Sequence, residues 1–497
     1  MPHLLFTKQI HRKLNYSSEL NESKSYGPHS IPTSILRLYK SELSVLLSKI
    51  FNISVNTGIF PDLMKVAKVI PIYKKGSELE VGNYRPISLL SNINKLLEKV
   101  VHERIYKFLD VHKCFYKYQF GFRKNHSTEH ALIEITERIF NALDAGQLAC
   151  GIFVDFEKAF DTVNHEILLK KLEYYGIRGI TNNWFRSYLT GRKQKVCING
   201  SESADIGIKH GVPQGSVLGP LLFLIYINDL HSAIKFSTPY HFADDTNLLN
   251  INESTKKLQK QINIDLKLLV NWLLANKISL NKSKTEMVFF TKPKQVINFN
   301  FKIKLDGLQL QHSNHVKYLG INLDNHLDGK YHADIVIKKL IRANGMLAKA
   351  RHYLEPTDIK ALYYSTFHTH MNYGSQVWLQ KTTQVRKNIH KLQKKALRIM
   401  SFSEFNASSS PLFKQWEILK LDDFMTIKNC SLAHDFLNAK LPETFNSFLE
   451  KQSEVHSIYT RCTEELTLRL PIVNLKTHGC QSPIWKSILL IGTNTQK

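Results

Sequence analysis

The spacing of apolar residues changes character at about residue 325. Before that point, short apolar runs of strand length alternate with longer runs of helical period. After it, apolar residues recur every three or four positions, as in helices that bury one face. The pattern predicts helices at 35–51, 93–109, 129–143, 258–276, 328–349, 385–400 and within 411–438. It predicts strands at 66–76, 83–90, 150–155 and 286–290, two short strands within 240–249, a β-hairpin over 299–310 that turns at Asp306-Gly307, and a strand with a glycine bend at 316–324. Ser127 or Thr128 can cap the helix 129–143, and the helix from 328 has an apolar face of Val336, Leu340, Ala343 and Leu347.

The stretch 240–249 carries two adjacent carboxylates between apolar flanks. If the flanks are two strands, Asp244 and Asp245 form the tight connection between them. Asp is common in exposed turns, so a solvated hairpin tip is one interpretation. No Gly or Asn stands beside the pair, however, and neighbouring like charges repel. A divalent cation such as Mg²⁺, which prefers carboxylate oxygens, is therefore a second interpretation.

Other charged residues stand at the ends of predicted strands. Asp155 ends the apolar strand 150–155, where a helix cap is the plain interpretation. The chain then turns into a helix that is expected to open at Asp161, which can cap it, and to run through Leu169. Lys284 precedes the strand 286–290, where a surface lysine is the plain interpretation.

Two further stretches suit a phosphate-bearing ligand. The segment 210–220 is rich in glycine, which lets the backbone approach a ligand closely, and its Gln214 offers both a donor and an acceptor. It is not a P-loop, because no Gly-Lys-Ser/Thr sequence follows. Lys74 and Arg85 are expected near one hairpin tip, which fits either a solvated basic turn or a grip on a triphosphate.

Composition indicates a polyanionic partner. The 497 residues include 67 Lys and Arg against 42 Asp and Glu, a formal net charge of +25. This excess favours nucleic acid first and an anionic membrane surface second. The helix 385–400 carries a single-sign stripe that is either a solvated face or a contact with a phosphate backbone. The apolar face of this helix is Val385, Ile389, Leu392, Ala396 and Ile399, and the stripe is Lys387, Lys391, Lys394 and Arg398.

The cysteine pattern and the hydropathy argue against several other classes of protein. None of the six cysteines forms a C-x₂-C pair, so a structural zinc site and a disulfide framework are not indicated. The longest apolar run, 221–227, is too short to span a bilayer. We therefore expect an intracellular protein of the nucleus and cytoplasm, neither secreted nor membrane-bound, whose oligomeric state the sequence leaves open.

Taken in order, these motifs resemble those of reverse transcriptases, specifically the enzymes of non-LTR, LINE-type retrotransposons of the Jockey group. The first catalytic motif, the glycine-rich motif and the aspartate hairpin are matched by 154–161, 211–220 and 242–246. The finger motifs are matched by 83–88 and 119–123, and the primer grip by 318–320. Weaker matches follow, such as Thr460 with Arg461.

The resemblance implies a fold class of α+β in the form of a right hand, with fingers, a palm built on a ferredoxin-like antiparallel sheet, and a helical thumb. It divides the chain into a lead-in at 1–23, fingers and palm at 24–325, a thumb at 326–405 and a C-terminal helical region at 406–497. The implied function is RNA-directed DNA polymerisation, and the implied partners are an RNA template, a DNA primer or target, and deoxynucleoside triphosphates.

The resemblance also assigns roles to residues. Asp155 and Asp244 would hold two Mg²⁺ ions, with Mn²⁺ as an alternative, and Asp245 would be a further ligand or an electrostatic support. Lys284 would be a general acid for pyrophosphate release. The nucleotide-binding residues would be Lys74, Arg85, Phe156, Phe160, Gln214 and Gly215. The nucleic-acid contacts would be Tyr318, Leu319, Gly320 and the basic stripe Lys387, Lys391, Lys394 and Arg398.

Some positions depart from the family pattern. His29 stands where Asp is usual, and Trp485-Lys486 stands where Trp-Asn is usual. We expect neither an apurinic-type endonuclease ahead of the first motif nor an RNase H-like carboxylate set after the thumb. Three alternatives stay open: an RNA-templated RNA polymerase, an intron-type maturase, and an inactive remnant that only binds nucleic acid. Phe160 argues against an RNA product, because the family keeps a bulky ring under the sugar there.

Overall fold

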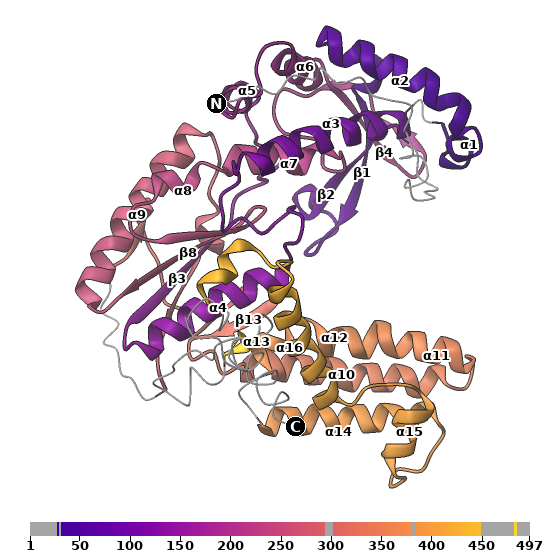
Figure 1. The fold of residues 1–497 in the computed structure, drawn as a ribbon, viewed down its shortest axis with the longest axis vertical. Helices are drawn as coiled ribbons and strands as arrows, with labels where there is room; N and C mark the ends of the chain where they lie inside the picture. Colours follow the sequence, from indigo (N-terminus) through magenta and orange to yellow (C-terminus); the bar gives the residue numbers. More distant parts are fainter. Residues whose placement is uncertain (1–26, 29–30, 294–301, 380–382, 449–481, 485–497) are drawn as a thin grey trace, which may run out of the picture. The chain divides into compact units, whose positions relative to one another are not determined.

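A computed structural model describes residues 27–28, 31–293, 302–379, 383–448 and 482–484 (Figure 1). The expectations at His29, the 299–301 arm of the predicted hairpin, Thr460, Arg461, Trp485 and Lys486 lie outside these residues. The chain divides into two compact units. The first holds the described residues up to Phe122, Asp155–Ile234 and Leu268–Asn281, and the second holds Arg123–Val154, Lys235–Lys267 and the described residues from Lys282 onward.

The first unit contains a mixed sheet ordered β2-β1-β4-β5, with β6 also paired to β4. The strand expected at 66–76 is β1, which ends earlier, at Tyr73, and its antiparallel partner β2 begins one residue later than 83. β4 runs parallel to β1. The bounds are β1 Val66–Tyr73, β2 Tyr84–Leu89, β4 Lys193–Ile198, β5 Ser201–Glu202 and β6 Ile206–Gly207.

Helices supply the apolar core of this unit. Every residue of α7 from Leu221 to Ile227 is buried, which explains why its sequence is apolar on all sides rather than along one stripe. Short 3-10 turns η2 Asp62–Met64 and η3 Val81–Asn83 flank the strands. The helices are α1 Thr33–Leu38, α2 Lys40–Thr57, α3 Asn92–Val111, α5 His165–Tyr174, α6 Gly179–Leu189, α7 Leu218–Ile227 and α8 Leu230–Ala233.

The predicted helix opening at Asp161 is wrong. The chain from Asp155 to Asn164 is a loop, and α5 begins at His165. The Asn164 side chain accepts a hydrogen bond from the backbone N–H of Ile167 at 3.1 Å and caps this helix. The Asp161 carboxylate is instead held by the side chain of Gln214 at 2.9 Å. A tertiary hydrogen bond thus replaces the local cap that the sequence predicted.

The second unit contains an antiparallel four-stranded sheet ordered β7-β8-β3-β9. All seven residues of β3 are buried, as expected for a central strand covered on both faces. α4 packs on this sheet (Figure 1) and is capped by the Ser127 hydroxyl, as the sequence allowed. The bounds are α4 Thr128–Asp144, β3 Leu148–Val154, β7 Thr238–Phe242, β8 Asp245–Asn252, η4 Lys282–Lys284 and β9 Glu286–Phe290. α9 Thr255–Ala275, predicted at 258–276, runs from this unit into the first.

Two short hairpins follow the sheet. The turn between β10 Lys304–Leu305 and β11 Leu308–Gln309 is Asp306-Gly307, with φ of 44° and 82°, which confirms the predicted Asp-Gly hairpin turn. The single bent strand predicted at 316–324 is wrong. It is a hairpin of β12 His315–Tyr318 and β13 Ile321–Asp324, because Leu319 and Gly320 both take the left-handed conformation and reverse the chain.

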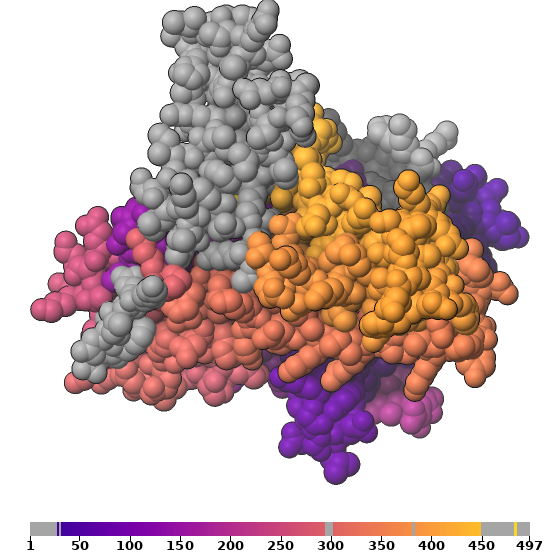
Figure 2. Space-filling model, turned by 90° about the horizontal axis from the view of Figure 1, so that it is seen from below, coloured from indigo at the N-terminus to yellow at the C-terminus, as the bar shows by residue number. Residues whose placement is uncertain are grey.

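The remainder of the second unit is a group of helices, whose outer surface appears in orange and gold in Figure 2. The predicted apolar face of α10, at Val336, Leu340, Ala343 and Leu347, is buried as expected. These elements are α10 Lys330–Ala350, α11 Pro356–Leu362, the π-helix η5 Tyr363–His368, α12 Thr369–Asn372, α13 Ser375–Trp378, α14 Thr383–Met400, α15 Ser409–Gln415, α16 Leu421–Leu437 and η6 Glu443–Ser447. No described helix is both long enough and apolar enough to cross a membrane.

The buried face of α14 differs from the predicted one. Leu392 and Ile399 are only half-buried, whereas Gln393, Leu397 and Met400 join the core. Gln393 is accommodated because all its polar groups are bonded: its Nε2 donates to Leu419 O at 2.9 Å, and its Oε1 accepts from the N–H of Leu421 at 3.1 Å. A buried amide is tolerated when its hydrogen bonds are satisfied.

Candidate active site

The aspartate pair lies one residue away from the predicted turn position. The turn between β7 and β8 is Ala243-Asp244, and Asp245 is the first residue of β8, paired with Phe242. Ala243 has a φ of 57°, an uncommon conformation for a residue with a Cβ. Asp244 is half-buried and Asp245 is exposed. The tip therefore presents one carboxylate from a strained two-residue turn and one from the strand that follows.

Asp155 directly follows β3, the strand that pairs with β8. β3 pairs with β8 so that Val154 stands opposite Thr246. Asp155 is the residue after Val154, and Asp245 is the residue before Thr246. The backbone carbonyl of Asp155 accepts a hydrogen bond from the N–H of Asn281 at 2.9 Å, which ties this point to the stretch that leads into η4.

Tyr318 is a buried residue close enough to Asp245 to feel its charge. It is only 3% exposed, and its ring packs edge-on against Phe153 of β3 with centroids 5.4 Å apart. Burial, and secondarily the charge of Asp245, raise the pKa of the Tyr318 hydroxyl. The Tyr318 side chain thus packs in the interior beside β3. The turn that follows it, Leu319-Gly320, is accessible to solvent.

Leu319 and Gly320 form that accessible turn. The hydroxyl of Tyr373 donates to Leu319 O at 2.6 Å and holds the turn from the helical group. Gly320 has a φ of 82°, and a Cβ there would lie 3.2 Å from the Tyr373 ring. Glycine is required here by conformation and by the close approach of the ring. The sequence did not single out Tyr373, because 54 residues separate it from Leu319.

In the first unit, backbone hydrogen bonds hold the glycine-rich loop against β2 and against the segment at Phe160. The backbone N–H of Ser88 in β2 donates to Gln214 O at 2.7 Å, and the N–H of Val212 donates to Phe160 O at 2.9 Å. Gly215 has a φ of 119°, and a Cβ there would lie 2.5 Å from Ser88 O. The strand that carries Arg85, the loop that carries Gln214, and Phe160 are therefore joined by direct hydrogen bonds.

A buried carboxylate that the sequence did not reveal anchors the same loop. Glu98 of α3 is completely buried and accepts hydrogen bonds from the Tyr188 hydroxyl at 2.9 Å and from the N–H of Val217 at 2.6 Å. The second bond caps the start of α7, directly after Ser216. Burial raises the pKa of the Glu98 carboxyl. Nothing local marks Glu98, since it lies 119 residues from Val217.

The two candidate aromatic residues differ in exposure. Phe156 is 6% exposed and forms an isolated bridge with Leu280, so its side chain belongs to the interior. Phe160 is half-buried: one face of its ring stacks on Phe223 with centroids 4.6 Å apart, and its edge meets Phe122. Only Phe160 of the pair presents part of its ring to solvent.

The remaining candidates are charged and at the surface. Lys74 and Arg85 are both exposed on the hairpin of β1 and β2, where Lys74 N–H donates to Asn83 O at 2.9 Å and Arg85 stands opposite Ile72. Lys284 is exposed in η4. In the basic stripe Lys387 and Lys391 are exposed, and Lys394 and Arg398 are half-buried. Arg398 donates from Nε to Ala407 O at 2.8 Å, so it also holds the loop after α14.

The donor set suits a hard divalent cation. Within the described residues no group of three or more His, Cys, Asp or Glu side chains forms a ready-made metal cluster. Mg²⁺ commonly takes one or two carboxylates together with water and substrate phosphates, rather than a cage made of protein alone. The half-buried Asp244 and the exposed Asp245 offer carboxylate oxygens of this kind.

Comparison with known proteins places these motifs in a family. The model of the reverse transcriptase (RNA-dependent DNA polymerase) family matches residues 72–323, about half of the chain. The chain is 31% identical over 404 residues to the RNA-directed DNA polymerase from mobile element jockey of Drosophila funebris, covering 77% of this chain and 43% of that protein. It is 26% identical over 470 residues to the probable RNA-directed DNA polymerase from transposon X-element of Drosophila melanogaster, covering 92% and 50%. The chain thus spans about half the length of the curated relatives it matches.

Proposed function

The chain belongs to the reverse transcriptase family, among those of non-LTR retrotransposons, and we propose that it extends a DNA primer on an RNA template. The observation that carries the proposal is the placement of three aspartates within the region that matches the family. Asp244 and Asp245 stand at the tip of the β7–β8 hairpin, and Asp155 follows the strand paired with β8. Reverse transcriptases in general use divalent metal ions, which bind oxygen ligands of this type.

Asp155, Asp244 and Asp245 would hold two Mg²⁺ ions, or Mn²⁺ in their place. When bound, such ions stabilise the charge that develops in an in-line phosphoryl displacement and lower the pKa of the attacking hydroxyl. The protein's contribution is rigidity. β3 is buried along its whole length, and β8, which follows the turn, is paired with β7 on one side and with β3 on the other. The carboxylates are therefore held ready before substrate binds.

Nucleotide binding would fall to the first unit. Lys74 and Arg85 would grip the triphosphate, where lysine acts as a point charge and arginine as a two-pronged donor. Gln214 and Gly215 would lie along the nucleotide, with backbone approach allowed by Gly215. Phe160 would meet the sugar and exclude a 2′-hydroxyl, whereas the buried Phe156 would support this segment. Lys284 would protonate the leaving pyrophosphate.

The fold elements suit a right-hand polymerase. In this proposal residues 24–325 form the fingers and palm, 326–405 form the thumb, and 406–497 form a C-terminal helical region. The turn Leu319-Gly320 would guide the primer, and the stripe on α14 would follow the phosphate backbone. An enzyme that copies RNA into a DNA target would act in the cytoplasm and nucleus.

Primer extension tests the proposal. The purified chain, given an RNA template annealed to a DNA primer, deoxynucleotides and Mg²⁺, should lengthen the primer. Asp244→Asn should lose several orders of magnitude in rate while keeping its melting temperature. Asp205→Asn, at an exposed acid outside the site, should be unaffected.

Three results would count against the proposal. Near wild-type extension by Asp244→Asn would refute the site assignment. Tight binding of the template–primer without extension would instead support a remnant that only binds nucleic acid. Addition of ribonucleotides in preference to deoxynucleotides would support an RNA polymerase.

A further inference from the structure

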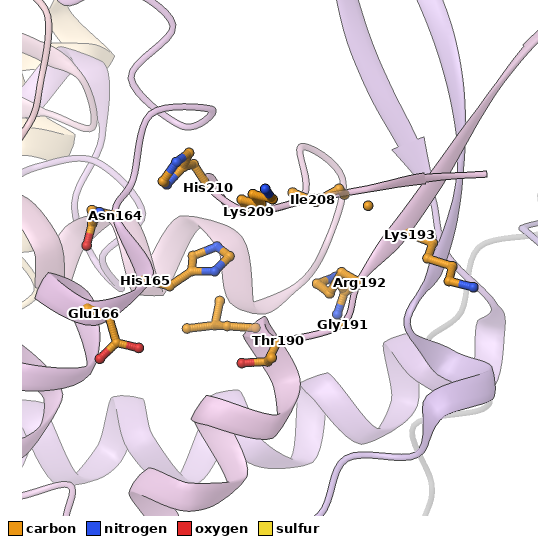
Figure 3. A pocket seen from close by; sticks show the side chains of 12 residues that line it. Asn164, His165, Glu166, Thr190, Gly191, Arg192, Lys193, Ile208, Lys209 and His210 are labelled. Atoms are coloured by element: carbon orange, nitrogen blue, oxygen red, sulfur yellow. The ribbon is translucent and has the colours of Figure 1, made fainter. Parts of the chain in front are cut away.

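A hollow in the first unit lies outside the residues assigned to nucleotide chemistry. It has a volume of about 450 Å³. Its wall comes from three segments: the start of α5, the link between α6 and β4, and the stretch 207–210 ahead of the glycine-rich loop. Figure 3 shows His165, His210 and Arg192 around this hollow. The volume is large enough for a nucleotide-sized group.

The lining combines apolar surface with several basic residues. Arg192, Lys193 and Lys209 carry positive charge, and His165 and His210 lie among them. Glu166 is the one carboxylate among these lining residues, and it is already paired with Arg186 at 2.9 Å. The hollow also meets the N-terminal end of α5, where the helix dipole adds partial positive charge. A site of this composition favours an anion.

Arg192 gives independent support, because it is a buried cation whose hydrogen bonds are incomplete. It is 1% exposed, and its Nη1 donates to Tyr188 O at 3.1 Å. Its Nε and Nη2 have no partner within the described part of the chain. The Tyr188 ring, whose centroid lies 4.8 Å from the guanidinium carbon, and the charge of the buried Glu98 already offset part of the cost of burying this cation. The two unsatisfied N–H donors remain costly, and an anion in the hollow would accept hydrogen bonds from them.

His165 lies close to these basic groups, and they affect its pKa. Its Nε2 donates to the backbone carbonyl of Gly211 at 2.8 Å, one residue after His210. Burial lowers the pKa of His165, and the nearby His210 and Arg192 lower it further. The same Gly211 opens the loop that carries Gln214, so a ligand in the hollow would lie against the base of that loop.

We propose that this hollow binds a phosphate group, and that its source is the phosphodiester backbone of a bound nucleic-acid strand. Guanidinium and ammonium groups match phosphate oxygens in charge and in donor geometry. A strand is favoured over a free anion because the whole chain carries a net charge of +25. The site needs neither metal nor nucleotide, so its test does not depend on the proposed polymerase activity.

Binding of a short labelled single-stranded RNA, measured by fluorescence anisotropy without Mg²⁺ or nucleotides, tests the proposal. Lys209→Glu should raise the Kd for RNA about tenfold. The slope of log Kd against log salt concentration should fall by the amount expected for about one lost phosphate contact. Lys170→Glu is the matched control, because Lys170 is an exposed lysine of α5 that does not line the hollow. Arg192→Gln is a second variant, with its melting temperature recorded beside its Kd.

Calorimetric titration with inorganic phosphate distinguishes the two sources. If the RNA Kd rises in Lys209→Glu but not in Lys170→Glu, the strand is the source. A second outcome is that inorganic phosphate binds the wild type but not Lys209→Glu, while the RNA Kd is equal in the two lysine variants. In that case the hollow is a phosphate site, but the nucleic-acid strand does not occupy it. If both variants match in RNA and phosphate binding, the proposal is overturned.

Discussion

Phe160→Val separates a sugar-selecting ring from an ordinary core aromatic. Phe160 stacks one face on the fully buried Phe223, with centroids 4.6 Å apart and an interplanar angle of 25°, while the rest of the ring is half-exposed. The loop position is fixed separately, by the hydrogen bond from Val212 N–H to Phe160 O. A smaller side chain should therefore change the ring's surroundings without moving the backbone.

The structure sets the expected cost in stability. Truncating a fully buried phenylalanine costs about 3–5 kcal/mol, and valine keeps part of a side chain that is only half-buried. We expect a loss of about 1–2 kcal/mol, which includes an aromatic pairing contribution of roughly 0.5–1.5 kcal/mol. For a domain of this size the melting temperature should fall by about 2–4 °C per kcal/mol.

The assay compares kcat/KM for a deoxynucleotide and the matching ribonucleotide on one RNA template. If the ring excludes the 2′-hydroxyl, the preference for the deoxynucleotide should fall by about tenfold or more, which corresponds to roughly 1.4 kcal/mol. Phe223→Leu is the control, because it removes the stacking partner from the core side and should lower the melting temperature without changing sugar preference. A lowered melting temperature with an unaltered ratio in Phe160→Val would refute the reasoning.

Three further outcomes are expected. Burial raises the pKa of Glu137 to about 8 from 4.5, so unfolding releases a proton between these values and stability should fall as pH rises through that window. Glu137→Gln should flatten the pH dependence of the melting temperature. If this pH dependence is unchanged in the variant, groups other than Glu137 cause it. Replacing Lys387, Lys391 and Lys394 of α14 with Gln should flatten the salt dependence of nucleic-acid binding. The matched control, Gln at the exposed Lys49, Lys107 and Lys170, should flatten it less. Lys284→Gln should lower kcat with little change in KM if this lysine is a general acid, and rapid-quench kinetics showing an unchanged chemical step would assign it to the surface.

Local pattern determined much of the secondary structure. The helical periods of α3, α4 and α9, and the Asp306-Gly307 turn, were predictable because each depends on residues within a few positions of one another. The same holds for the cap at Ser127. The motif order also predicted the family, since short motifs in sequence order need no knowledge of how they meet.

Tertiary contacts decided the details of the candidate site. The Ala243-Asp244 turn is set by the pairing of Phe242 with Asp245 between β7 and β8, whereas the pairing of β8 with β3 joins residues that no short window contains. Asp161 failed as a cap because Gln214, 53 residues away, takes its carboxylate. Tyr318 is buried against Phe153 although its motif suggested a ligand contact.

The sequence by itself therefore determined the elements, the charge excess and the family, because each is encoded by neighbouring residues or by composition. Only the tertiary structure decided which side chains are buried and which hydrogen bonds remain open. The hollow around Arg192 shows the reason most clearly: its three wall segments are remote in sequence, and the guanidinium's missing partners exist only once those segments have packed.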